Sequence, residues 1–198
     1  MNRFMLDSDN SMDNLELNKF ANSIRSRRTI NFFKLEPVPD SLILDAIEVA
    51  RWAPNHKKTE PWHFHLLGKQ TQEKVKAVIT DIKVKEQGDG AHQSIRARLD
   101  AIPGWLVLSC DVSAESTRQF EDYAACACAA QNLMLYLWQA GVGTKWTTGK
   151  VIRTQAFYDI LGLEMKNQLI VGLFWYGYPD QLPAQTRKPL EEITKRLD

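Results

Sequence analysis

The feature that most constrains this chain is a long apolar run in its second half, residues 123–140, which reads YAACACAAQNLMLYLWQA. A run of this length could span a membrane or form a helix buried in a protein core. It contains Gln131, Asn132 and Gln139, whose polar amides are costly in lipid. We therefore expect a buried helix over residues 120–140, ended by Gly141 in a left-handed cap.

Composition fits a single globular domain and argues against several classes of partner. The chain has 198 residues, of which 44% are hydrophobic and 25% charged, and its formal net charge is +1. This balance gives no electrostatic case for binding nucleic acid or an acidic membrane surface. One modest domain cannot easily bury so apolar a helix together with many aromatic residues, so we expect an obligate dimer.

The pattern along the chain predicts an arm followed by one domain of mixed helices and strands. Residues 1–15 are expected to form a flexible arm, and residues 16–198 a single domain. Asp40 or Ser41 is expected to cap a helix that Pro54 ends. The polar, Gly-interrupted segment 85–104 is expected to be the most mobile. The expected helices cover 15–26, 41–53, 70–84 and 120–140, and the expected strands 61–68, 105–112 and 168–179, which indicates an α+β or α/β class.

Cysteine and histidine positions argue against disulfides and metal. The count of three cysteines fits a reducing compartment, and the polar start has no signal peptide, so we expect a cytoplasmic protein. Cys126 and Cys128 should point to different faces of one helix, and Cys110 should lie in the core. His63 and His65 share a strand face, but no third ligand has metal-site spacing.

Three segments carry residues suited to ligand chemistry. The first combines Arg25, Arg27, Arg28 and Thr29 at a helix-to-strand boundary. Adjacent guanidiniums and a hydroxyl make a good phosphate clamp, because arginine binds phosphate through forked, charge-assisted bonds. On spacing alone, however, a solvated basic turn is the favoured interpretation.

The second segment is the loop after Pro54, which presents Asn55, His56, Lys57 and Lys58. These are donors suited to an anionic or polar ring edge, although an ordinary solvated loop explains the same residues. The third segment is 131–149. Its Gly141 and Gly143 allow a tight turn, and the residues that follow offer an aromatic surface and two hydroxyls: Trp146, Thr147 and Thr148.

Taken together and in order, these segments resemble the nitroreductase family. The match runs from about residue 20 to 193, and a His-Lys pair after Ala-Pro and a short middle segment place it nearest the short bacterial NAD(P)H nitroreductase branch. The matching segments are RSRRTINFF, PVPDSLILDAIEVARWAPNHKKTEPWHFHLL, QNLMLYLWQAGVGTKWTTG, IVGLFWYGYP and RKPLEE.

The resemblance implies an α+β fold with a mixed central sheet flanked by helices, and an intertwined homodimer with two FMN sites at its interface. Arg27, Arg28 and Thr29 would hold the phosphate and ribityl end of FMN, with Arg187 near the phosphate. His56 would reach in from the partner subunit. The other implied FMN-binding residues are Asn31, Asn55, Lys58, Trp146, Thr147 and Thr148.

The implied activity is FMN-dependent oxidation of NADH or NADPH by a ping-pong hydride mechanism. The acceptor would be a small molecule such as a nitroaromatic compound, a quinone or a related electron-poor compound. Alternatives are other flavin chemistry on the same scaffold (dehalogenation, enone or flavin reduction), a flavin-binding module without turnover, or a structural dimer that has lost FMN. No catalytic side chain is expected, because FMN carries the chemistry.

The chain departs from the family pattern beside the flavin. Asn31 stands where the family often has Arg or Lys, near the pyrimidine edge, and Asn55, Lys58 and Glu60 also replace common family residues. The source of positive charge beside the flavin is therefore open, and the candidates are Lys57, Lys58 and Lys145.

Overall fold

A computed structural model describes residues 12–197 of the chain. Its core is a four-stranded sheet in the order β1-β2-β4-β3, and every neighbouring pair is antiparallel. A parallel bridge between Thr29 and Thr144 extends the β3 edge, and the mixed character of the sheet rests on this bridge. The predicted α+β class is confirmed. The strands are β1 (Trp62–Leu66), β2 (Gly104–Asp111), β3 (Gly143–Thr147) and β4 (Gln168–Gly177).

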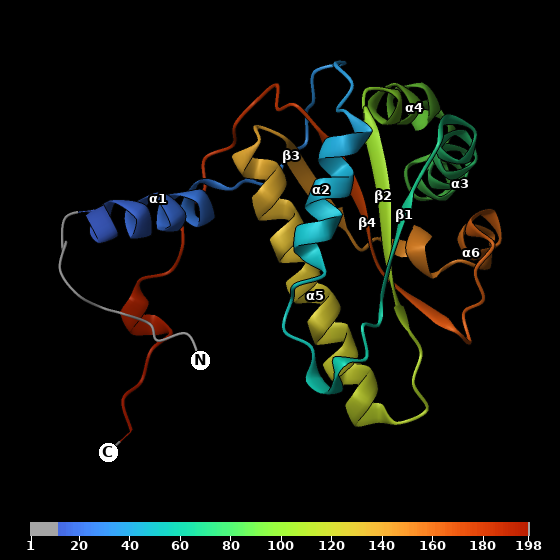
Figure 1. The fold of residues 1–198 in the computed structure, drawn as a ribbon. Coiled ribbons are helices and arrows are strands. Elements are labelled where there is room, and N and C mark those ends of the chain that lie inside the picture. Colours follow the sequence, from blue (N-terminus) through green and yellow to red (C-terminus); the bar gives the residue numbers. More distant parts are fainter. Residues whose placement is uncertain (1–11, 198) are drawn as a thin grey trace.

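Helices cover both faces of the sheet (Figure 1). One face packs against α2 (Asp40–Ala50) and α5 (Ser116–Gln139), and the other against α3 (Lys69–Gln87), α4 (His92–Asp100) and α6 (Gln155–Leu161). Burial on both faces explains why β2 is a nearly continuous apolar run rather than an alternating one. The short 3₁₀ turns are η1 (His56–Lys58), η2 (Asp89–Ala91), η3 (Lys150–Arg153) and η4 (Leu190–Glu192).

The central helix α5 confirms the prediction made from the apolar run. Its buried face consists mostly of small and aliphatic residues, so it packs closely on the sheet and on α2. Gly141 adopts φ +79°, and Val142 N–H donates to the Leu137 carbonyl (2.8 Å), which closes the helix with the expected left-handed cap. Within residues 12–197, no helix is long and apolar enough to cross a membrane.

The ends of α2 differ from the prediction. The N-cap residue is Pro39, not Asp40 or Ser41, and no side chain caps the helix. The helix ends at Ala50, four residues before Pro54, and the next residues form tighter i→i−3 bonds, from Trp52 N–H to the Val49 carbonyl (3.2 Å) and from Ala53 N–H to the Ala50 carbonyl (3.1 Å). Proline disfavours helical geometry in the residue before it, Ala53, so the chain forms this turn instead of another helical turn.

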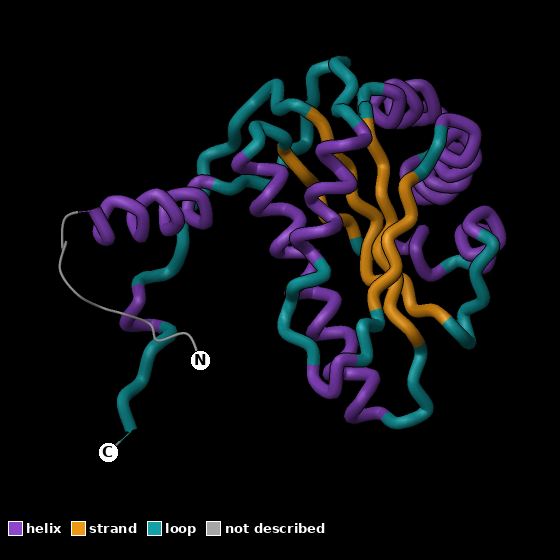
Figure 2. Tube along the Cα trace, viewed as in Figure 1, coloured by secondary structure: helices purple, strands orange, loops and turns teal. Residues whose placement is uncertain are grey.

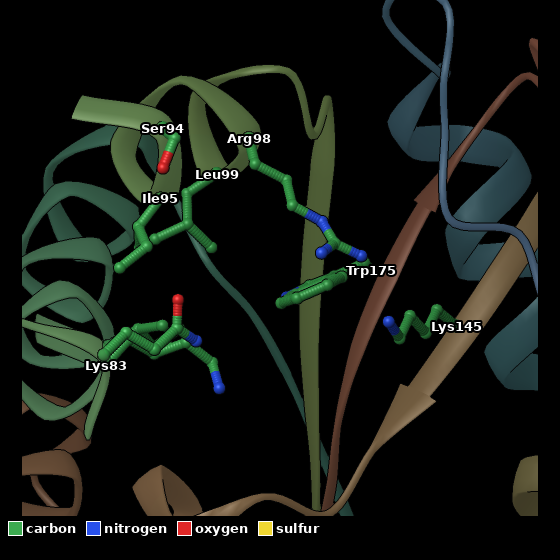
Figure 3. A pocket seen from close by; sticks show the side chains of 9 residues that line it. Lys83, Ser94, Ile95, Arg98, Leu99, Lys145 and Trp175 are labelled. Carbon is green, nitrogen blue, oxygen red and sulfur yellow. The ribbon is translucent and has the colours of Figure 1, made fainter. Parts of the chain in front are cut away.

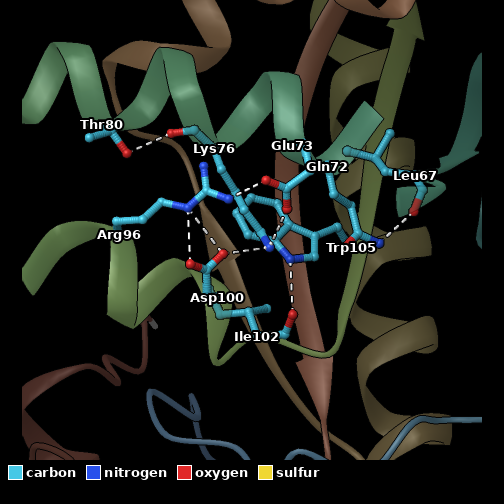
Figure 4. A network of polar contacts seen from close by, with 9 residues as sticks. All are labelled: Leu67, Gln72, Glu73, Lys76, Thr80, Arg96, Asp100, Ile102 and Trp105. Carbon is cyan, nitrogen blue, oxygen red and sulfur yellow. Dashed lines mark hydrogen bonds and ion pairs between the residues drawn. The ribbon is translucent and has the colours of Figure 1, made fainter. Parts of the chain in front are cut away.

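The segment 85–104, predicted to be the most mobile, is helical over most of its length. Ile95 and Leu99 of α4 are buried, and a set of ion pairs joins α4 to α3 (Figure 4). We call this set the α3–α4 ion network. In it Lys76 Nζ lies 3.0 Å from both Glu73 and Asp100, and Arg96 pairs with the same two carboxylates.

Gly141 and Gly143 were predicted to allow a tight turn, but only Gly141 lies in the turn, and Gly143 begins strand β3. Gly143 is required there for packing, because a Cβ at this position would clash with the Ile30 side chain. The glycine therefore lets the segment 29–33 lie against the sheet edge, where Ile30 N–H donates to the Thr144 carbonyl (3.0 Å).

Two pieces of the chain extend away from this body. Helix α1 (Met12–Ser26) and the C-terminal segment after β4 both project from the same side (Figures 1 and 2). Both carry large apolar side chains in solvent, including Phe20 at 61% and Ile193 at 70% exposure. Residues 1–11, most of the arm predicted over residues 1–15, lie outside the described residues.

Candidate functional site

The three arginines implied by the family motifs, Arg27, Arg28 and Arg187, meet around one cavity of about 480 Å³. It lies where the end of α1, the middle of α5 and the C-terminal segment converge. Among the described residues its lining contains four arginines and no carboxylate. We call it the arginine cavity, and its lining residues are Ile24, Arg25, Arg27, Arg28, Gln131, Gln185 and Arg187.

Arg28 builds the wall of the arginine cavity. Its Nε donates to the Pro183 carbonyl (3.2 Å), and its NH1 donates to the carbonyls of Arg25 (2.6 Å) and Arg27 (3.0 Å). These bonds fix the C-terminal segment to the chain that follows α1, although the two are far apart in sequence. Backbone hydrogen bonds from Lys34 N–H to the Tyr178 carbonyl (2.9 Å) and from Asp180 N–H to the Phe32 carbonyl (3.0 Å) join the same two segments, so the two motifs form one site through both sets of bonds.

Arg27 carries an unpaired charge in the arginine cavity. Its side chain is half buried and makes no hydrogen bond or ion pair with any residue in 12–197. Burial, and then the neighbouring charges of Arg187 and Arg28, lower the pKa of Arg27. Cations brought together without a counter-charge repel one another, so an anion in the cavity would relieve this cost. Arginine's forked donors suit phosphate in particular.

The chain leads directly from the arginine cavity to Asn31 and Lys145. Thr29 is exposed and bridges to Thr144 of β3, and two residues later Asn31 Oδ1 accepts a hydrogen bond from Lys145 Nζ (2.8 Å). The four steps from Arg27 to Asn31 span at most about 14 Å. One cationic region thus follows another along the β3 edge.

The residues after Lys145 are largely engaged within the fold. Trp146 Nε1 donates to the Val171 carbonyl (3.1 Å), and its ring stacks on Phe174 with centroids 5.4 Å apart. Thr147 Oγ1 donates to a β4 carbonyl (2.9 Å), while Thr148 is exposed. Of the three predicted flavin-lining residues, Thr148 is therefore the most open to a ligand.

The loop of Asn55, His56 and Lys58 is held in shape by its own polar groups. The Asn55 side chain accepts from Glu60 N–H (2.7 Å) and donates to Thr59 Oγ1 (2.9 Å), so its amide serves the loop. Three non-glycine residues here have left-handed backbones: Lys57 (φ 58°), Lys58 (φ 54°) and Glu60 (φ 48°). This conformation is costly for such residues and is often kept where a loop binds a ligand.

Within one chain this loop lies apart from the arginine cavity. It is anchored near the start of α5, where Thr59 Oγ1 donates to the buried Asp122 (2.5 Å). Gln131 of the cavity follows roughly 13 Å further along the same helix, at about 1.5 Å per residue. His56 and Lys58 are both exposed there, so one copy of the chain does not bring them to the arginines.

Sequence reasoning missed the two glutamines of the cavity, Gln131 and Gln185, as well as the apolar Ile24. Gln131 had a signal, since it is a polar residue in an otherwise apolar helix. Gln185 had none, because its position depends on how the C-terminal segment folds back.

The remaining candidates behave as structural residues. Cys110 and Cys126 are buried and Cys128 is exposed, as predicted. His63 Nε2 contacts Asp111 (2.8 Å) and His65 Nε2 contacts Ser109 (2.9 Å). The described residues contain no group of His, Cys, Asp and Glu suited to a metal ion.

Fold and site together define a class of protein. It has an α+β fold and a cavity whose arginines lack a carboxylate partner, which suits a phosphate-bearing ligand. Comparison with known proteins makes the assignment specific. The sequence model of the nitroreductase family matches residues 24–178. The chain therefore belongs to the nitroreductase family, as its motifs predicted.

Individual relatives agree over most of the chain. It is 32% identical over 174 residues to the Bacillus subtilis protein named "Putative NAD(P)H nitroreductase YfhC", covering 85% of this chain and 89% of that one. The fold is similar to a nitroreductase-like family protein from Bacillus cereus, with a TM-score of 0.81, 29% identity, and coverage of 90% and 96%.

A more distant structure shares the fold alone. The FMN-dependent nitroreductase NfnB from Mycobacterium smegmatis, solved in complex with NADPH, has a TM-score of 0.74 and 18% identity. The match covers 92% of this chain and all (100%) of that one.

Proposed function

We propose that the chain is an FMN-dependent NAD(P)H oxidoreductase that acts as a homodimer in the cytoplasm. The observation that carries this proposal is the arginine cavity, in which Arg27 has no counter-charge among the described residues. The phosphate of FMN supplies that charge. Membership of the nitroreductase family supports this choice of ligand, and so does the fold shared with the M. smegmatis enzyme, which is FMN-dependent and was solved with NADPH.

The residues present fit FMN. Arg27 and Arg187 would bind the phosphate, Arg28 would hold the cavity wall, and the exposed Thr29 hydroxyl would face the ribityl chain. Asn31 would lie beside the ring. When bound, FMN supplies two-electron hydride chemistry, taking electrons from NADH or NADPH and giving them to a second molecule in ping-pong order. The chain's own task is to orient the ring and leave one face open.

Exposed apolar surface supports a dimer. Helix α1 carries Leu15, Leu17 and Phe20 in solvent, each more than half exposed, and the C-terminal segment carries Leu190 and Ile193 in the same state. Surface of this kind is usual in obligate interfaces and rare on free monomers. A second copy that buries these projecting pieces would give the intertwined arrangement.

The dimer also explains the loop of His56 and Lys58. The loop is preorganised but distant from the arginines of its own chain, so its donors would reach the arginine cavity of the partner subunit. Each FMN site would then take its phosphate clamp from one subunit and this loop from the other.

Absorption of the purified protein tests the activity. We expect a bound flavin band that is bleached anaerobically by NADH or NADPH and restored by a nitroaromatic compound or a quinone. A protein that neither carries nor takes up FMN would contradict the proposal. A flavin band that neither nicotinamide bleaches would leave only a binding module. Restoration by a halogenated aromatic or an enone alone would identify the alternative chemistries.

Complementation between subunits tests the shared site. Arg27→Ala and His56→Ala chains, co-expressed with different tags, form heterodimers. If His56 acts across the interface, one site in each heterodimer is intact, and a random mixture has about a quarter of all sites working. If His56 acts within its own chain, every site keeps a defect and no activity returns. A folded monomer in sedimentation at low micromolar concentration would contradict the dimer itself.

A further inference from the structure

A second cationic cavity, of about 410 Å³, lies on the sheet face covered by α3 and α4 (Figure 3). Lys145 reaches it from β3, Trp175 from β4, Arg98 from α4 and Lys83 from α3. No described carboxylate lines this cavity. Its other lining residues are apolar or neutral: Ile79, Gln87, Ser94, Ile95 and Leu99.

The charges of this second cavity are poorly compensated. Arg98 makes no hydrogen bond or ion pair with any described residue, and the nearest carboxylate oxygen to Lys83 Nζ, on Glu86, is 3.8 Å away. Among residues 12–197, Lys145 Nζ contacts only the neutral amide of Asn31 (2.8 Å) and the ring of Trp175 (5.0 Å to the centroid). Burial, then Arg98 and Lys83, lower the pKa of Lys145. A ligand with negative charge would relieve these groups.

A buried donor beside the same cations is also unsatisfied. Trp175 Nε1 is buried and has no hydrogen-bond partner, the only such side-chain atom among the described residues. Buried polar groups in native proteins nearly always have a partner, so this one indicates a missing acceptor. The ligand should therefore offer both negative charge and a hydrogen-bond acceptor at one end.

The second cavity lies close to the arginine cavity along the chain. Lys145 donates to Asn31, and Asn31 is four residues from Arg27, a span of at most about 14 Å. A single elongated ligand can therefore have its phosphate at Arg27 and its other end at Lys145. The ring system of FMN is joined to the phosphate through the ribityl chain. One edge of it, the pyrimidine, has carbonyl acceptors and becomes negatively charged when the flavin gains two electrons, whereas the opposite, dimethylbenzene edge is apolar.

We propose that this second cavity receives the pyrimidine end of FMN, and that Lys145, with Arg98 behind it, supplies the positive charge that Asn31 lacks. The proposal rests on the proposed function, because it assumes that FMN is the ligand. It assigns to Lys145 a direct contact with the flavin and to Arg98 a supporting charge. It also places Asn31 as the acceptor that holds the Lys145 ammonium in position.

Redox titration of the bound flavin tests this assignment. In Lys145→Met, and in Lys145→Gln as a second uncharged variant, we expect the preference for reduced over oxidised FMN to fall about tenfold, which lowers the midpoint potential by about 30 mV. Lys145→Arg should keep the potential of the parent. Arg98→Met should shift it in the same direction by less.

Lys166→Met is the matched control. Lys166 is an exposed lysine that pairs with Glu164 (3.2 Å) and does not line the second cavity. It should leave the potential unchanged. Equal potentials in the parent, Lys145→Met and Lys145→Gln, with FMN still bound, would overturn this inference and leave the proposed function intact. A parent protein that does not bind FMN at all would overturn both.

Discussion

Two clusters of cations in this protein contrast in how their charges are balanced. In the α3–α4 ion network the buried ammonium of Lys76 lies 3.0 Å from each of two carboxylates. In the arginine cavity Arg27 has no partner among the described residues, and its neighbours are other arginines. The charges of the first cluster are compensated within the fold, whereas those of the second have no carboxylate among the described residues.

This contrast gives a physical criterion for separating structure from function. Both clusters contain cationic side chains that are partly or fully buried. A cation paired with carboxylates joins two helices and does no more, whereas unpaired cations around a cavity are kept at a cost in repulsion and burial. The proposed binding site therefore rests on charge compensation in three dimensions and not on the presence of basic residues alone.

The largest expected effect concerns ligand affinity. Arg27→Ala should weaken FMN binding by roughly tenfold or more, because a lost charge-assisted contact costs about 1.5–3 kcal/mol. The unfolding free energy of the FMN-free protein should change little, since no described partner is lost. Arg96→Ala, in the ion network, should do the reverse. Fluorescence titration with FMN measures the affinity, and urea unfolding measures the unfolding free energy. If Arg27→Ala and Arg96→Ala changed both quantities alike, the contrast between the two clusters would be wrong.

A smaller effect is expected from the network itself. Lys76→Met should lower the unfolding free energy by about 1–2 kcal/mol without changing FMN affinity. The loss stays below that of a fully buried pair because Glu73 and Asp100 are about half exposed and water can hydrate them. Urea denaturation of the FMN-free protein provides the measurement. A weakened FMN affinity in Lys76→Met would mean that the network is part of the site.

The smallest effect concerns pH. The pKa of Lys145 is lowered from its ordinary value of 10.5 in the folded chain. Between the lowered folded pKa and 10.5, the unfolded state holds a proton that the folded state has released, so stability rises with pH across that window. Below the window both states are protonated, and the cost of burying the charge is present in full.

Lys145→Met should therefore stabilise the FMN-free protein slightly at neutral pH. It should also reduce the increase in unfolding free energy with alkaline pH. We expect less than about 1 kcal/mol, because the ammonium is half exposed and water screens it. Urea unfolding at neutral and alkaline pH measures the effect, with Lys166→Met as control. A destabilised Lys145→Met at neutral pH would show that Lys145 already has its counter-charge.

The sequence predicted those parts of the fold that depend on local pattern. The apolar run gave α5, the glycine after it gave the helix cap, and the apolar strands β2 and β4 lie where expected. The arginines of the site were found through their resemblance to a family motif, since spacing alone favoured a solvated turn.

The rest depends on contacts between distant segments. Lys145 and Asn31 are 114 positions apart, so neither residue reveals their hydrogen bond on its own. Segment 85–104 was predicted to be mobile because it is polar and interrupted by glycine, yet Asp100 and Arg96 form ion pairs with residues of α3. Gly143 read as part of a ligand-binding turn because the sequence cannot show that Ile30 packs against it.

Comparing FMN with riboflavin, which lacks the phosphate, tests the central claim most directly. Dissociation constants of both ligands would be measured for the parent protein and for Arg27→Ala. The parent should bind FMN much more tightly than riboflavin, and Arg27→Ala should lose at least tenfold of that preference while its riboflavin affinity changes little. An Arg27→Ala variant that keeps the full preference for FMN over riboflavin would show that the arginine cavity does not bind the phosphate.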